Sequence, residues 1–205
     1  MITAVEGTNF YSGLTYVEPL IGNMLYWVWV GGTVPDGEGM YAVNEPLPPN
    51  SQLFGLGINC AGAINLFFRA AEKRVPTRDN EFFDGGVGAY FDSPTLDPEL
   101  GNNGYFHGYD ESLDLAKAKG WAEETRSGVL LGRPYVNETL AGQGHVAVLL
   151  PSGYVLQSFQ FNPNGQPGLN WDYTIEESNF DAFEGDYYKR MVHPENWIDY
   201  EGDEF

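Results

Sequence analysis

The spacing of apolar positions predicts an amphipathic helix that begins at the only cysteine of the chain. Ile64, Phe67, Phe68 and Ala71 follow Cys60 at helical spacing. An asparagine suited to an N-cap precedes the cysteine, two basic residues close the run, and a proline ends it. We therefore expect a helix with a thiol in its first turn.

Two runs rich in β-forming residues, 145–150 and 154–159, predict a β-hairpin. A Pro-Ser-Gly turn separates them, and a three-residue loop would place Gly153 in the left-handed region. Side chains alternate along strands, so His145 and Gln157 should share a face, directly opposed or one diagonal step apart. The hairpin thus brings an imidazole close to an amide.

The remaining pattern is coarser and favours an α+β fold in a single domain spanning residues 1–205, without a separate binding module. Long glycine-rich and proline-rich stretches predict loops between the elements, and Trp197 should pin the end of the fold. Further expected elements are a buried strand over 25–30, a helical patch over 111–122, and strands over 168–175 and 187–192.

The chain is strongly acidic, with a formal net charge of −19 and a pI near 4.2. Nucleic-acid binding is therefore not expected, since it relies on Lys and Arg neutralising phosphates and only 10 are present. A solubilising acidic surface is the favoured interpretation, with salt adaptation or a cationic substrate as alternatives. A single cysteine also excludes an intrachain disulfide.

Cys60 is the candidate nucleophile, because backbone N–H groups and the helix dipole at a first turn stabilise a thiolate. Of three histidines, His145 has a strand-like context and is the candidate base, whereas His107 suits a loop. The histidines and the cysteine have no metal-site spacing, so neither zinc nor another cofactor is expected. The competing interpretation makes Cys60 a small buried apolar residue and His145 a satisfied core histidine.

Four features follow one another along the chain: the pattern over 54–62, the helix after it, Gly144 to Val148, and a polar residue twelve positions beyond His145. Together they resemble the NlpC-type cell-wall cysteine peptidases. That superfamily is papain-like and related to the CHAP amidases. The resemblance implies a papain-like core in which the nucleophile helix packs on a central antiparallel sheet, with long loop insertions. It assigns Cys60 as nucleophile, His145 as base and Gln157 as the third, orienting residue. Two features depart from the family: Asn-Cys-Ala-Gly replaces the usual Asp-Cys-Ser-Gly, and the segment between cysteine and histidine is longer.

The same resemblance implies an N-terminal extension over about 1–50 and an insertion over about 76–142. It implies a peptidoglycan hydrolase, of the kind found as phage endolysins or virion-associated lysins, that cleaves an amide or peptide bond. Cys60 thiolate, paired with protonated His145, would attack the carbonyl, and Gln157 would accept the other ring N–H. The alternatives are a non-catalytic virion structural or binding protein on the same fold, and a papain-like amidase toxin with another amide substrate.

The expected location follows from the N-terminus, which shows no secretory signal, and from the absence of a predicted transmembrane segment. Such a hydrolase would be made in the host cytoplasm and would act at the cell wall after lysis or as part of a virion. Its expected partners are bacterial peptidoglycan and virion tail proteins.

Overall fold

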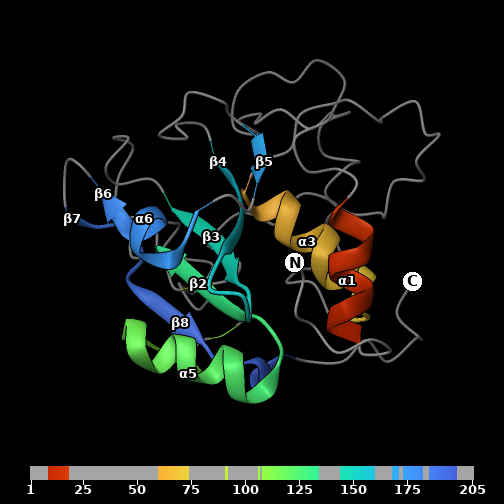
Figure 1. Ribbon diagram of the computed structural model, residues 1–205, viewed down its shortest axis with the longest axis horizontal. Helices are drawn as coiled ribbons and strands as arrows, with labels where there is room; N and C mark the ends of the chain where they lie inside the picture. The colour runs from red at the N-terminus through yellow and green to blue at the C-terminus, as the bar shows by residue number, and fades with distance from the viewer. Residues whose placement is uncertain are drawn as a thin grey trace, which may run out of the picture.

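The computed structural model describes residues 9–18, 60–73, 91, 106, 108–133, 144–159, 168–170, 173–181 and 185–197 (Figure 1). The helices are α1 (Asn9–Val17), α3 (Cys60–Ala70), α5 (Leu115–Thr125) and α6 (Ile175–Asn179), followed by the 3-10 helix η4 (Pro194–Asn196). The strands are β1 (Asp110–Ser112), β2 (Val129–Arg133), β3 (His145–Leu149), β4 (Val155–Phe159), β5 (Gly168–Asn170), β6 (Phe180–Asp181), β7 (Gly185–Asp186) and β8 (Arg190–Val192). Helices and antiparallel strands together make an α+β fold, as the sequence predicted.

Six strands form the central sheet in the order β1-β8-β2-β3-β4-β5, and every neighbouring pair is antiparallel. β6 and β7 pair separately as a short ribbon. The predicted hairpin over 145–159 forms β3 and β4, so its two strands lie side by side next to β2.

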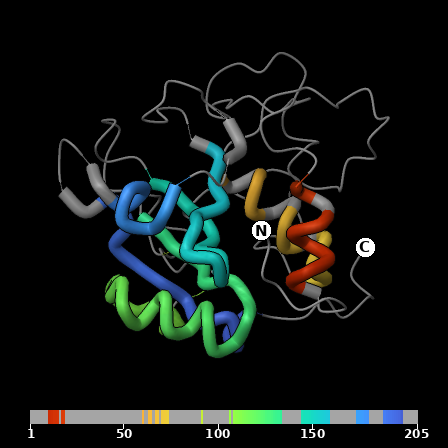
Figure 2. Tube along the Cα trace, in the orientation of Figure 1, coloured from red at the N-terminus to blue at the C-terminus, as the bar shows by residue number. Residues whose placement is uncertain are grey.

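The sheet separates two apolar clusters, because successive side chains of a strand point to opposite faces. Val146 and Val148 belong to the cluster that contains α1 and α3, whereas Ala147 and Leu149 belong to the cluster that contains α5. Figures 1 and 2 show the same arrangement, with α1 and α3 on one side of the sheet and α5 on the other. The helices therefore cover both faces.

The helix α1 was not anticipated from the sequence, although it lies within the expected N-terminal extension. Phe10, Leu14 and Val17 are buried in the same cluster as α3. A Cβ at Gly13 would lie 2.8 Å from the carbonyl oxygen of Phe67, so the backbones of the two helices approach closely at this glycine. This part of the extension is integral to the core.

Three other boundaries differ from expectation. β2 lies in the range assigned to an insertion, yet its five residues are all buried between β8 and β3. The run over 168–175 divides into β5 and the start of α6, and the last strand is shortened to β8. The helical patch forms α5, which begins after Asp114, whose carboxylate accepts a hydrogen bond from the Lys117 main-chain N–H at 3.0 Å.

The strand expected over 25–30, the expected N-cap Asn59 and His107 lie outside the described residues. Within the described ranges, no helix has the length and apolar character needed to cross a membrane.

Candidate functional site

The β3–β4 hairpin positions the first two candidate residues. Val148 pairs with Leu156, and the same register extended by one residue sets Gln157 opposite Ala147. His145 is then one diagonal step from Gln157, which is one of the two arrangements expected. The turn closes with Gly153 at φ +86°, in the left-handed region predicted for it.

A direct hydrogen bond joins the two side chains, with 2.9 Å between His145 Nε2 and Gln157 Oε1. An amide oxygen can only accept, so the ring nitrogen that faces it carries the proton. The neutral imidazole is therefore the Nε2–H tautomer, and Nδ1 holds the lone pair that can accept a proton. The predicted contact is present, and it fixes which ring nitrogen is basic.

Tyr188 is a member of this site that sequence reasoning missed. Its hydroxyl donates to the same Gln157 oxygen at 2.6 Å, and its ring centroid lies 5.9 Å from that of His145. Tyr187 packs edge-on against the imidazole at 5.3 Å. The sequence placed both tyrosines at the start of the strand expected over 187–192 and gave no signal of a contact with the hairpin.

Asn179, the last residue of α6, holds the segment that carries the two tyrosines. Its side-chain oxygen accepts from the Tyr188 main-chain N–H at 2.7 Å, and its carbonyl oxygen accepts from the Tyr187 N–H. Asn179 and Tyr188 are both buried. The phenol is thereby anchored by its main chain as well as by its hydroxyl.

A buried cation completes the surroundings of the imidazole. Arg133 is paired with His145 in the β2–β3 register, and its guanidinium lies 4.8 Å from the centroid of the Tyr187 ring. A fixed positive charge near the ring disfavours a second one on the imidazole.

The pKa of His145 is lowered from 6.5 to about 4, mainly by burial. The hydrogen bond that the ring donates to Gln157 raises the pKa, and the charge of Arg133 lowers it. His145 is 2% exposed, and at neutral pH its imidazole is neutral. The protonated partner expected for a Cys60 thiolate is therefore not the resting form of this ring.

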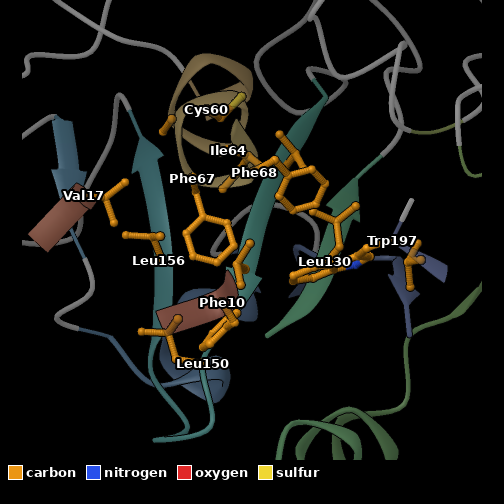
Figure 3. Close-up of a cluster of buried hydrophobic side chains, with 14 of the residues drawn as sticks. Phe10, Val17, Cys60, Ile64, Phe67, Phe68, Leu130, Leu150, Leu156 and Trp197 are labelled. Carbon is orange, nitrogen blue, oxygen red and sulfur yellow. The ribbon is translucent and has the colours of Figure 1, made fainter. Parts of the chain in front are cut away.

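Cys60 is the first residue of α3 and belongs to the cluster between that helix and the sheet. Figure 3 shows it at one end of α3, with Phe67 and Phe10 farther along the cluster. His145 and Gln157 alternate with the strand residues that face α3, so their side chains point toward the other face.

An electrostatic interaction links the thiol to the network on the other face. The pKa of Tyr188 is raised well above its usual value, mainly by burial and then by the neighbouring charges of Tyr187 and Cys60. Thus His145, Gln157 and Tyr188 are joined by hydrogen bonds, and Cys60 lies within electrostatic range of the phenol.

His193 has a local structural role. Its Nδ1 accepts from the Glu195 main-chain N–H at 3.2 Å at the start of η4, and its ring packs edge-on against Trp121. Among the described residues, no group of three or more His, Cys, Asp or Glu side chains is arranged to hold a metal ion.

Comparison with protein-family models, with curated proteins and with solved structures gives no significant match.

Proposed function

We propose that this protein is a papain-like cysteine hydrolase that cleaves an amide or peptide bond of bacterial peptidoglycan. The observation that carries the proposal is the hydrogen bond between His145 and Gln157, on a sheet against which a helix opening with Cys60 packs. It leaves Nδ1 as the basic nitrogen, as a general base requires. The substrate class rests on the resemblance to NlpC-type peptidases.

The proposed reaction is acyl transfer through a thioester. As the Cys60 sulfur bonds to the carbonyl carbon, neutral His145 takes the thiol proton on Nδ1, and the main-chain N–H of Cys60 donates to the oxyanion. The C–N bond then breaks while the imidazolium returns its proton to the leaving amine. Water, deprotonated by the same nitrogen, releases the acid and regenerates the thiol. Gln157 keeps Nε2–H directed away from the reacting atoms.

The proposal places a geometric requirement on the start of β3. Because α3 and the imidazole lie toward different faces, sulfur and Nδ1 can meet only at the end of the sheet where β3 begins. We expect a separation of about 4 Å or less in a substrate-analogue complex. A crystal structure of that complex with the thiol beyond reach of Nδ1 would exclude the mechanism.

The biological setting belongs to the same proposal. A phage lysin of this kind would reach the wall by release at lysis or as a component of a virion, where tail proteins would be its partners. Purified phage particles, probed with an antibody to this chain, would distinguish virion packaging from release at lysis.

Digestion of purified peptidoglycan tests the activity. The wild-type chain should release fragments whose new amine and carboxyl ends, identified by mass spectrometry, define the bond. Cys60→Ser keeps the side-chain shape but supplies a poor nucleophile, so release should fall at least about 1,000-fold. Tyr154→Phe, on the same hairpin but 43% exposed, is the matched control and should retain activity. Equal release by Cys60→Ser and wild type would refute thiol catalysis.

The burial of the network favours a second candidate, a non-catalytic binding or virion structural protein on the same fold. Cys60 is 9% exposed and His145 only 2%, as expected of side chains that serve packing. Such a protein would sediment with intact peptidoglycan and release no fragments. The same digestion therefore separates the two candidates.

A further inference from the structure

We propose that Tyr188 is a positioning residue of this site, whose hydroxyl fixes the Gln157 amide with its oxygen toward His145. It would thereby set which ring nitrogen can accept a proton. The consequence for catalysis rests on the proposed function, whereas the effect on the tautomer does not.

The two ends of the Gln157 side-chain amide differ in whether they donate or accept a hydrogen bond. Gln157 is neutral and its Oε1 and Nε2 ends are nearly equal in size, so shape alone does not choose between its two orientations. In the observed orientation, Oε1 receives two donors, His145 Nε2–H at 2.9 Å and the Tyr188 hydroxyl at 2.6 Å. Rotating the amide would direct its NH₂ group at both partners, so the Tyr188 hydroxyl would have to accept from that group and would lose the oxygen to which it now donates. His145 could then only accept at Nε2, which would move the ring proton to Nδ1, the atom proposed as the base.

The phenol is held firmly enough to impose this choice. Tyr188 is 1% exposed, its main-chain N–H is bound by Asn179, and its ring packs edge-on against Tyr187 with centroids 5.5 Å apart. Because the main chain and the ring of Tyr188 are both held in place, its hydroxyl moves little relative to the hairpin. It therefore acts on Gln157 from outside the two strands that carry the candidate pair.

Tyr188→Phe is a clean change because it removes the hydroxyl and leaves the charges around the imidazole in place. Arg133 of β2 supplies the charge that lowers the pKa of His145, and the Tyr187 ring packs edge-on against the imidazole. The ring of the phenylalanine still fills the site. A changed tautomer would then come from the lost hydrogen bond.

The direct measurement is ¹⁵N NMR of the full chain with labelled histidine, above the pH at which His145 protonates. Wild type should show His145 mainly as Nε2–H. Tyr188→Phe should shift a substantial fraction to Nδ1–H, and Tyr154→Phe, which removes an exposed hydroxyl, should leave the spectrum unchanged. A wild-type tautomer in Tyr188→Phe would overturn the proposal.

A second variant separates positioning from packing. A carboxylate presents an acceptor in either orientation, so Gln157→Glu removes the ambiguity that Tyr188 is proposed to resolve. In that background Tyr188→Phe should leave the Nε2–H tautomer unaltered at pH values where the ring is neutral. An equal loss of this tautomer in both backgrounds would assign Tyr188 a packing role only.

Peptidoglycan cleavage supplies the catalytic readout. Tyr188→Phe should lower kcat about 10-fold with KM unchanged, since it alters the base and not the substrate contacts. The double variant with Gln157→Ala should be no slower than Gln157→Ala alone, because the hydroxyl acts through the amide. Wild type without activity would refute the proposed function and leave the tautomer test intact. Unchanged kcat in Tyr188→Phe beside an active wild type would refute the positioning role.

Discussion

A neutral residue that orients a buried histidine does little to stabilise the protonated form of its ring. A carboxylate beside the imidazole would stabilise its protonated form, but Gln157 offers only an amide oxygen. Burial therefore prevails, and together with the charge of Arg133 it keeps the pKa of His145 near 4. A site built this way suits general-base chemistry from a neutral ring and does not favour a stable thiolate–imidazolium pair.

The lowered pKa of His145 predicts how stability depends on pH. In the unfolded chain the ring titrates near 6.5 and in the folded chain near 4, so between these values the unfolded state binds more protons. The contribution of the neutral ring is complete above about pH 6.5 and is lost as the pH falls to about 4, by about 3 kcal/mol. Urea unfolding across this range measures it.

His145→Gln provides the comparison, because it removes the titrating group from both states. Carboxylates elsewhere contribute to acid destabilisation in both proteins, so the difference between the two curves isolates His145. Parallel curves from pH 7 to pH 4 would mean that the ring titrates normally in the folded chain. The predicted burial effect would then be wrong.

At the scale of elements, the sequence predicted the parts whose signals are local. The helix over Cys60–Ala70 and the hairpin of β3 and β4 each carry an uninterrupted pattern with capping or turn residues. The diagonal relation of His145 to Gln157 follows from strand alternation and loop length alone. Those two elements supplied all three predicted site residues.

The missed parts depend on contacts between distant segments. α1 is short, and its apolar face becomes informative only against α3, where Gly13 permits close approach. β2 is apolar throughout and lacks the alternation that would mark a strand with one exposed face. Tyr188 meets Gln157 across 31 positions of sequence, a pairing that no local pattern specifies. Tertiary packing thus contributed what sequence periodicity could not.

Two glycines at contrasting positions give a test of these local rules. Gly153 has φ +86° in the hairpin turn, where an L side chain is strained, so Gly153→Ala should destabilise the fold by about 1 kcal/mol. Gly120 lies exposed within α5 with open space at its Cβ position, so Gly120→Ala should stabilise by up to about 1 kcal/mol. Chemical denaturation of both variants checks the opposite signs. A gain of stability at Gly153 would contradict the turn geometry.

At the scale of the whole molecule, charge repulsion opposes folding. The net charge of −19 is offset locally by ion pairs, among them Lys117–Glu111, Lys119–Glu176 and Arg190–Asp110 in the described residues. The two exposed pairs, Lys117–Glu111 and Lys119–Glu176, contribute about 0–1 kcal/mol each, whereas the excess of negative charge acts across the entire surface. The repulsion should therefore decide the sign of the salt dependence.

Stability should accordingly rise with ionic strength. Raising NaCl from about 0.01 M to about 0.15 M shortens the screening length from about 30 Å to about 8 Å, which weakens distant repulsion more than contacts between paired groups. The free energy of unfolding, measured in urea, should increase over this range, and KCl should act like NaCl because screening is not specific to the cation. A stability that falls with salt would mean that the ion pairs outweigh the repulsion.

The last turn of α5 offers a way to change this repulsion at a known place. Glu123 and Glu124 are exposed there, where negative charge is unfavourable to the helix dipole. The last turn itself holds no basic residue, and Arg126 follows it at the C-cap. Converting both to lysine reduces the net negative charge and places positive charge at the negative end of the helix dipole. The free energy of unfolding at low salt should therefore rise by about 1 kcal/mol. Converting both to glutamine should give about half that gain. The salt dependence should become shallower in the same order, from wild type through the glutamine variant to the lysine variant. Identical salt slopes in all three chains would show that repulsion among these carboxylates does not limit stability.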